Sequence, residues 1–194
     1  MELRLDYLPD RQFLALRFGP GEFESVPIFR ELRFWGVDRA PCPDLSALAA
    51  MIVLKNHNIQ SLTLSGVAIS PPVCTALSRH FEVEIHPETY DANRRNLPGG
   101  DKIIVPARFT RSVENQLSVD GAEMLTWISL RDMFGPLGGT IRTNIDVFDL
   151  AESEKDLLVA LCCGGKSVGH ILMDEKLLEY EHVVHRIGLE LFTQ

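Results

Sequence analysis

The chain has 194 residues, of which 45% are hydrophobic and 24% are charged. These fractions are typical of a globular domain and argue against a disordered or fibrous chain. The longest uninterrupted apolar run, residues 47–54, is far shorter than the roughly 18 residues that cross a bilayer, and the charged N-terminus does not resemble a signal peptide. The formal net charge of −8 disfavours nucleic acid and anionic membranes as partners.

Cysteine usage is sparse, with Cys42, Cys74 and the adjacent pair Cys162 and Cys163. Neighbouring cysteines on a strand point to opposite faces and would form a bridge only with strain. The sequence therefore predicts reduced thiols, a cytoplasmic location and no membrane anchor. The composition leaves the oligomeric state open.

The N-terminal residues predict a β-hairpin. Apolar side chains alternate at Leu3, Leu5 and Tyr7, a turn follows at Pro9-Asp10, and a second alternating run covers residues 13–18.

Two segments thirty residues apart share one pattern. Leu32-Arg33-Phe34-Trp35-Gly36-Val37 is followed by Pro41, and Leu62-Thr63-Leu64-Ser65-Gly66-Val67 is followed by Pro71. Each segment fits a strand, a glycine turn and a helix that a proline opens. Because one such unit cannot cover its own apolar face, two in tandem predict a parallel sheet with helices against it. Asp44 and Ser70 are the expected helix N-caps, and residues 83–86 the third parallel strand.

The pattern is lost between His86 and Asp101, where we expect a loop. This loop would connect two lobes of a single domain over residues 1–194, the first a strand–helix repeat lobe (1–97) and the second a mixed α/β lobe (101–194).

The second lobe mixes helical and alternating patterns. We predict a strand over 102–107, a helix from Asp120 through Phe134, a strand over 140–148, a hairpin of 157–163 with 168–173, and a helix over 175–192. The predicted fold class is α/β, with parallel strand–helix units in the N-terminal half and a mixed sheet with a hairpin and a C-terminal helix in the second half.

No complete catalytic or nucleotide-binding motif is present. Gly164-Gly165-Lys166-Ser167 is similar to the end of a phosphate-binding loop, but the segment after it alternates like a strand, so a hairpin turn is favoured. Glu179 and His182 have a Glu-x-x-His spacing, which is half of a di-metal ligand set with no second half in the chain. The sequence predicts neither a metal nor a cofactor.

Ligands of parallel sheets bind beyond the carboxyl ends of the strands, where loops and helix N-termini converge. A small anionic ligand is thus expected at those ends. There His86 and Glu88 are candidate acid–base residues, and the candidate ligand-binding residues are Trp35, Arg39, Tyr90, Arg94 and Arg95, with Asp38 close by.

Two functions compete on this evidence. The first is a soluble protein-binding module, such as an adaptor, inhibitor or immunity-type protein, whose acidic surface at Glu152, Glu154 and Asp156 attracts a basic partner. The alternative is a small enzyme that acts on a phosphorylated or carboxylated molecule at the carboxyl ends of the strands. Nucleic-acid binding is the least favoured function, because only Tyr90 and Phe109 offer stacking groups near the basic residues.

Overall fold

The structure is a computed structural model, and it describes residues 1–20, 30–91, 101–109, 121–132, 138–173 and 177–193. These residues form a mixed α/β fold with one ten-stranded sheet and four α-helices, which confirms the predicted fold class. The elements of residues 1–91 are β1 (Glu2–Leu8), β2 (Phe13–Gly19), β3 (Glu31–Trp35), α1 (Pro43–Leu54), β4 (Ser61–Ile69), α2 (Pro71–Phe81) and β5 (Glu84–Tyr90).

The same order of elements recurs after residue 101. The second set is β6 (Lys102–Arg108), β7 (Ala122–Ser129), β8 (Ile141–Thr143), α3 (Glu152–Cys163), β9 (Val168–Met173), α4 (Leu178–Arg186) and β10 (Glu190–Thr193). The sheet order β10-β9-β6-β7-β8-β3-β2-β1-β4-β5 is mirrored about its centre, because β3 and β8 hold equivalent places in the two sets and pair with each other.

Strand direction breaks this correspondence at one position. β2 runs antiparallel to both β1 and β3, whereas β7 runs parallel to both β6 and β8. β8 then pairs antiparallel with β3, with Trp35 opposite Arg142. Five adjacent strands, β10 to β8, are therefore parallel to one another, and their amino ends lie at the same edge as the carboxyl end of β3.

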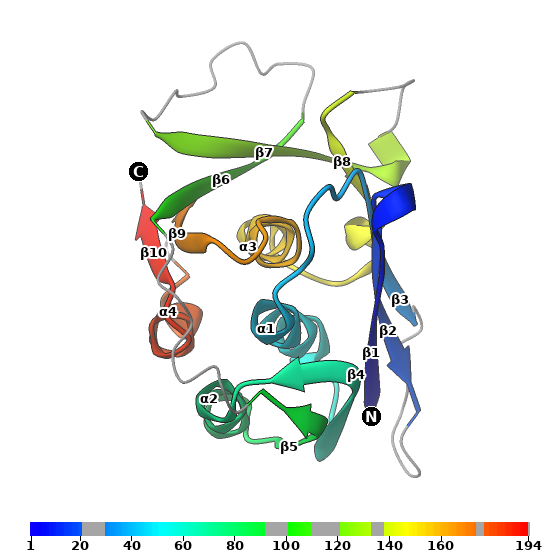
Figure 1. The fold of residues 1–194 in the computed structure, drawn as a ribbon, viewed down its shortest axis with the longest axis vertical. Coiled ribbons are helices and arrows are strands. Elements are labelled where there is room, and N and C mark those ends of the chain that lie inside the picture. The colour runs from blue at the N-terminus through cyan, green and yellow to red at the C-terminus, as the bar shows by residue number, and fades with distance from the viewer. Residues whose placement is uncertain (21–29, 92–100, 110–120, 133–137, 174–176, 194) are drawn as a thin grey trace.

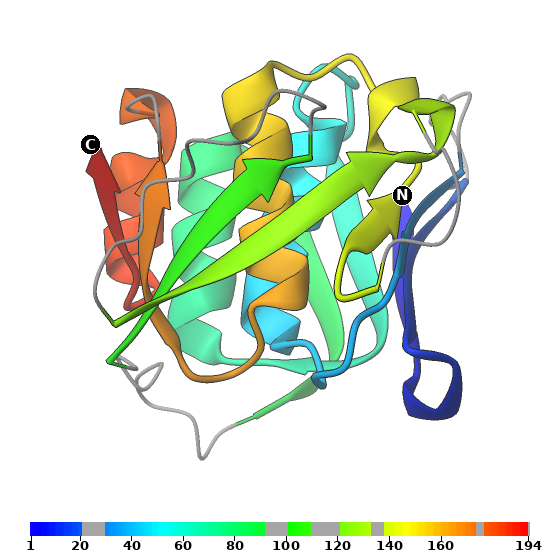
Figure 2. The same cartoon turned by 90° about the horizontal axis from the view of Figure 1, so that it is seen from above.

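The sheet curves around α1 and α3, which lie inside it, while α2 and α4 lie between its two end strands, β5 and β10 (Figures 1 and 2). Every residue of α1 from Asp44 to Leu54 is buried, as a helix enclosed on all sides requires. The four helices all lie on the concave side of the sheet, so no described helix covers the outer face of β1, β2 and β3. None of the described helices is long and apolar enough to cross a bilayer.

Several N-terminal predictions are confirmed, and the strand pairing is corrected. The hairpin β1–β2, the helices α1 and α2 and the parallel pair β4–β5 are present. The two repeat strands, however, are not neighbours, because β1 and β2 lie between β3 and β4. Asp44 is not an N-cap: Cys42 holds that position, and the buried Asp44 carboxylate instead accepts a hydrogen bond from the Ser70 amide at 2.8 Å.

The predicted helix that begins at Asp120 is wrong. Residues 122–129 form β7, which pairs with β6 and β8 and turns Leu125, Trp127 and Ser129 inward. The expected helix ends, Asp120 and Phe134, lie outside the described residues.

Three further predictions in the second half need correction. Residues 157–163 belong to α3, so they do not form the predicted hairpin with residues 168–173. The latter form β9, which pairs in parallel with β6 and β10. In place of the long helix predicted over 175–192, the structure has the shorter α4. Gly188 at φ +82° follows this helix, and β10 comes next. Of the strand predicted over 140–148, only the three residues of β8 are a strand.

We expect Gly36→Ala to destabilise the fold by about 2 kcal/mol. Gly36 lies at φ +85°, and a Cβ there would come within 3.1 Å of the Thr140 carbonyl oxygen, which is backbone and cannot move away cheaply. Gly66→Ala is the matched control, because Gly66 has φ +73° but open space around it, so only the backbone strain of about 1 kcal/mol applies. Urea denaturation measures the free energy of unfolding of both variants. Equal losses of stability in the two would contradict the steric argument.

Candidate functional site

The described residues among those predicted at the carboxyl ends of the strands do not all lie together. Trp35 ends β3 and Arg39 follows it, whereas His86, Glu88 and Tyr90 lie on β5. The strands β2, β1 and β4 lie between β3 and β5. The predicted convergence depended on β3 and β5 being close together in one parallel sheet, and the inserted hairpin separates them.

On β5 the candidate acid–base residues are exposed. The His86 ring is 3.4 Å from the Glu84 carboxylate, and both side chains are more than half exposed. Glu88 accepts a hydrogen bond from the Gly66 amide at 2.9 Å, and Tyr90 is 56% exposed at the end of the strand. Arg94 and Arg95 lie outside the described residues. The described part of β5 thus shows no buried acid–base pair.

The three predicted partner-binding acids point in different directions from α3. Glu152 is exposed and pairs with Arg108 at 2.8 Å. Glu154 is buried and accepts hydrogen bonds from Lys55, from the Tyr180 hydroxyl and from a backbone amide. Asp156 accepts a hydrogen bond from the Trp127 indole nitrogen at 2.5 Å. All three carboxylates are therefore paired within the protein, only Glu152 is exposed, and they do not make a single acidic surface.

Basic side chains gather instead on the outer face of the first three strands. We call Arg4 on β1, Arg17 on β2 and Arg33 on β3 the arginine face. Their side chains are 65%, 51% and 47% exposed. Two carboxylates lie between them, Asp6 and Glu31, each only 19% exposed.

These carboxylates hold the guanidinium groups in place. Asp6 pairs with Arg4 at 2.9 Å and with Arg17 at 3.0 Å, and Glu31 pairs with Arg17 at 3.2 Å and with Arg33 at 2.6 Å. Burial alone would raise the pKa of Glu31, but hydrogen bonds from Arg33 and Arg17 outweigh it and lower the pKa. Glu31 consequently stays charged and keeps the arginines ordered. Among these five side chains the guanidiniums are the most exposed.

A row of apolar side chains crosses the same strands at one end. Leu8, Phe13 and Trp35 occupy directly paired positions on β1, β2 and β3. The Phe13 and Trp35 rings are 5.4 Å apart, and Leu8 is 44% exposed. We call these three residues the apolar row. Together with the arginine face it makes a continuous sheet surface of apolar and cationic groups.

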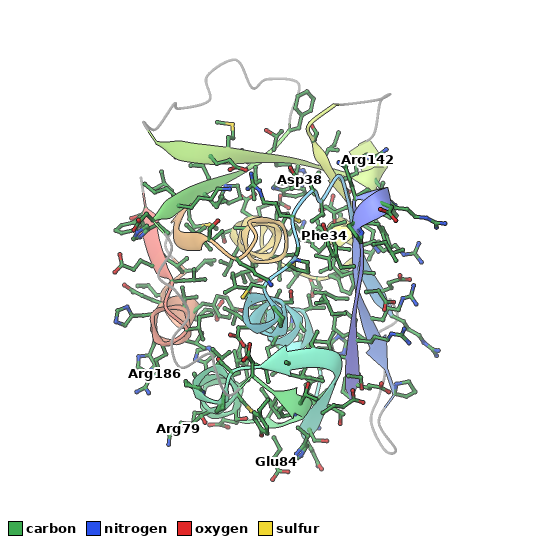
Figure 3. All side chains as sticks on the ribbon, in the orientation of Figure 1. Phe34, Asp38, Arg79, Glu84, Arg142 and Arg186 are labelled. Atoms are coloured by element: carbon green, nitrogen blue, oxygen red, sulfur yellow. The ribbon has the colours of Figure 1, made fainter. Side chains whose placement is uncertain are left out.

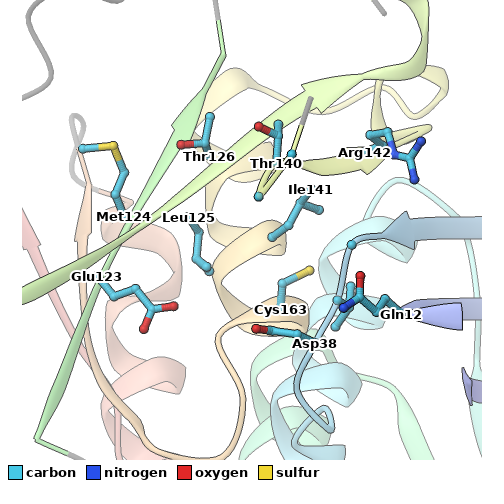
Figure 4. Close-up of a pocket in the computed structure, with 14 residues that line it drawn as sticks. Gln12, Asp38, Glu123, Met124, Leu125, Thr126, Thr140, Ile141, Arg142 and Cys163 are labelled. Carbon is cyan, nitrogen blue, oxygen red and sulfur yellow. The ribbon is translucent and has the colours of Figure 1, made fainter. Parts of the chain in front are cut away.

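A cavity of about 410 Å³ opens where the two sets of strands meet, at the carboxyl end of β3 and the amino ends of β7 and β8 (Figure 4). The C-terminal end of α3 also reaches it through Cys163. The residues that line the cavity are Gln12, Gly36, Val37, Asp38, Glu123, Met124, Leu125, Thr126, Gly138, Gly139, Thr140, Ile141, Arg142 and Cys163. Its location contrasts with the predicted one, because the parallel strands here contribute their amino ends.

The charges around this cavity differ in how they are paired. Glu123 bridges Arg39, at 2.6 Å, and Lys102; burial alone would raise its pKa, but these two partners lower it. Arg39 is therefore engaged by Glu123 rather than free for an anion. Arg142 also borders the cavity, but its side chain is on the outer face of the sheet, because it is directly paired with Trp35. The Asp38 side chain is 67% exposed, and its salt-bridge partner among the described residues is Arg39, at 3.9 Å.

Cys163, the one thiol among the described lining residues, is poorly suited to nucleophilic chemistry. Complete burial, the neighbouring Cys162 and the Asp38 charge all raise the pKa of Cys163 well above its usual value, so the thiol remains protonated. No cluster of histidine, cysteine or acidic side chains suited to a metal occurs among the described residues.

Comparisons with protein families, curated proteins and solved structures found no match to this chain. The site must therefore be interpreted from its own geometry. The sequence drew attention to Trp35, Asp38 and Arg39 but missed the arginine face. The available signal was the polar side of the predicted hairpin, where Arg4 and Arg17 alternate with apolar residues.

Proposed function

We propose that the protein is a protein-binding module that docks the acidic segment of a partner on its outer sheet surface. The observation that carries this proposal is the arginine face, in which three guanidiniums are exposed while the carboxylates between them are mostly covered. Arginine and tryptophan are enriched at the energetic centres of protein interfaces, and the apolar row supplies Trp35 beside the arginines.

The acidic character of the partner follows from the local charge. Guanidiniums held in a fixed array favour carboxylates, which they bind through two parallel hydrogen bonds. The sequence alone favoured a basic partner, on the strength of Glu152, Glu154 and Asp156, but only Glu152 among them is freely exposed. The partner that we propose is accordingly acidic, which is the opposite charge to the one predicted from the sequence.

A protein partner is preferred to a nucleic acid. The chain carries a net charge of −8, which opposes the approach of a polyanion to the molecule as a whole. Three arginines on adjacent strands are sufficient for a short acidic segment. A long phosphate backbone would also meet the repulsive parts of the surface.

Charge reversal in Arg17→Glu with Arg33→Glu tests the proposal. The control is Arg79→Glu with Arg186→Glu, which makes the same change in net charge at exposed positions that Figure 3 shows on the opposite side of the molecule. The measurement is capture from native lysate with chemical crosslinking and mass spectrometry. We expect one protein to be retained through crosslinks in an Asp/Glu-rich segment, with affinity reduced about 100-fold by the first pair and little by the control.

Three outcomes would overturn the proposal. They are equal retention by both pairs of variants, crosslinks that map to another face, and a captured species that nuclease treatment releases. Raising the salt concentration should shorten the lifetime of the expected complex, because the arginines are exposed and therefore screened.

A further inference from the structure

The apolar row on the outer face of the sheet continues into a charged residue. Trp35, the last residue of this row, is directly paired with Arg142 on β8. The Arg142 side chain therefore lies on the outer face, directed away from Cys163 in the cavity wall (Figure 4).

We propose that Trp35 and Arg142 together recognise one feature of the docked acidic segment. An apolar side chain of the segment lies on the Trp35 ring, and a neighbouring carboxylate binds the Arg142 guanidinium. We call these two residues the recognition point. This inference rests on the docking function proposed above and specifies the partner sequence that fits it.

Arg142 differs from the arginine face in its ion pairs. The three guanidiniums of that face share the carboxylates of Asp6 and Glu31, at distances of 2.6 to 3.2 Å. Among the residues that the structure describes, no carboxylate is within salt-bridge distance of Arg142. An acidic residue of the partner consequently pairs with Arg142 without displacing a carboxylate of this chain, whereas on the arginine face it competes with Asp6 and Glu31.

The neighbours of Arg142 favour a strong ion pair. Arg142 lies between Trp35 on β3 and Ile128 on β7, and it is directly paired with both. Ile128 is only 3% exposed, and Arg142 and Trp35 are both partly buried. Apolar neighbours exclude water, and opposite charges attract more strongly where less water surrounds them. A carboxylate bound at Arg142 should therefore contribute more to affinity than one bound at the more exposed Arg4 or Arg17.

Two aromatic rings supply the apolar half of the recognised feature. The Phe13 and Trp35 rings are 5.4 Å apart at an angle of 53°, and both side chains are only partly buried. Aromatic surfaces of this kind bind aromatic or long aliphatic side chains of a partner. Directly paired residues of antiparallel strands have Cβ atoms about 5 Å apart, so the Arg142 guanidinium reaches a carboxylate next to a side chain on Trp35.

Arg33 restricts the partner sequence on a second side. It precedes Trp35 by two residues on β3, on the same face of the sheet and about 7 Å away. An apolar side chain on Trp35 thus has one guanidinium along the strand, at Arg33, and one across the sheet, at Arg142. The segment that fits has an aromatic or long aliphatic residue with an acidic residue within two positions on either side.

The test is isothermal titration of the purified protein with three synthetic peptides. The first is a glutamate-rich peptide with one phenylalanine at its centre. The second has alanine in place of the phenylalanine, and the third has glutamine in place of every glutamate. We expect the first peptide to bind at least about tenfold more tightly than either of the others. No binding by the first peptide, or equal affinity for the second or the third, would overturn the inference.

Two variants locate the bound peptide. Arg142→Gln and Trp35→Ala should each weaken binding of the first peptide about tenfold or more. Arg79→Gln, which removes a charge on α2 on the opposite side of the molecule, should leave it unchanged (Figure 3). Arg142→Gln keeps a polar side chain on the surface, so it tests the inference even where Trp35→Ala does not fold. Unchanged affinity in Arg142→Gln would refute the recognition point.

Capture from native lysate separates this inference from the docking function. If Arg142→Gln retains the partner as well as the native protein does, while Arg17→Glu with Arg33→Glu loses it, the docking surface is correct and the recognition point is wrong. Retention that none of these substitutions reduces would contradict the docking function itself.

Discussion

Replacing Glu154 by alanine is expected to lower the free energy of unfolding by about 3 kcal/mol. The Glu154 side chain is 3% exposed and accepts hydrogen bonds from Lys55, from the Tyr180 hydroxyl at 2.7 Å and from the Ala151 amide at 3.0 Å. Its removal takes the acceptor from three donors. Lys55 keeps Glu179 at 3.7 Å, whereas the hydroxyl of the buried Tyr180 has little access to water. Chemical denaturation monitored by circular dichroism measures the loss.

Glu152→Ala is the matched control for this substitution. Glu152 is on the same helix, two residues away, and it pairs with both Arg108 and Lys155, but its side chain is 61% exposed. Exposed ion pairs contribute at most about 1 kcal/mol, so we expect a small effect. Losses of similar size in the two variants would contradict the argument from burial.

The contribution of Glu154 should also depend on pH. Burial alone would raise the pKa of Glu154, but hydrogen bonds from Lys55, Tyr180 and Ala151 hold it below its ordinary value of 4.5. A carboxyl group with a lowered folded-state pKa stabilises the protein above its unfolded-state pKa, and this stabilisation is lost as the pH falls through the folded-state pKa. The difference in Tm between the native protein and Glu154→Gln should be constant near neutral pH and narrow below 4.5. If this difference in Tm widened on acidification, the lowered pKa of Glu154 would be refuted.

The sequence predicted elements well where local signals agreed with one another. Ser70 at the N-cap and Pro71 at the first helical position placed the start of α2, and the alternation in residues 3–7 and 13–18 placed the hairpin β1–β2. These signals act over a few residues, so a single sequence contains them.

Prediction from the sequence failed where burial removes the periodic pattern of apolar and polar residues. The run Leu157-Leu158-Val159-Ala160-Leu161-Cys162-Cys163 was predicted as a strand, yet it forms most of α3, and each of these residues is buried. A helix enclosed by the sheet and by α1 has no polar face, so its 3.6-residue period disappears. The charged stretch over 152–156 was the overlooked sign of a helix start, because acidic residues favour the first turn.

The candidate site was only partly predictable for a different reason. Trp35, Asp38 and Arg39 could be named because Trp35 ends a strand and the other two come shortly after it. Their neighbours in space come from distant strands, Glu123 from β7 and Arg142 from β8. Of these two strands only β8 pairs with β3, and this long-range pairing is not encoded locally. Likewise, the arginine face depends on the register of three strands, which the sequence does not specify by itself.

Trp127→Ala is expected to destabilise the protein by about 4 kcal/mol. Trp127 is fully buried on β7, the strand that the sequence analysis had predicted to be a helix. Its indole nitrogen donates a hydrogen bond to Asp156 at 2.5 Å, and the Arg108 guanidinium lies 5.2 Å from the ring centroid. Truncation therefore creates a cavity and removes a donor from a carboxylate at the same time.

Two variants separate these contributions. Trp127→Phe keeps most of the ring volume but loses the N–H group, so we expect a loss of about 2 kcal/mol. Trp35→Phe is the control, because Trp35 is only partly buried on the outer face and should cost less than about 1 kcal/mol. Trp35 and Trp127 are the two tryptophans of the chain, so the fluorescence of Trp35→Phe reports Trp127 alone. A blue-shifted emission there would agree with the enclosed indole on β7, whereas emission typical of an exposed indole would contradict this strand's place in the fold.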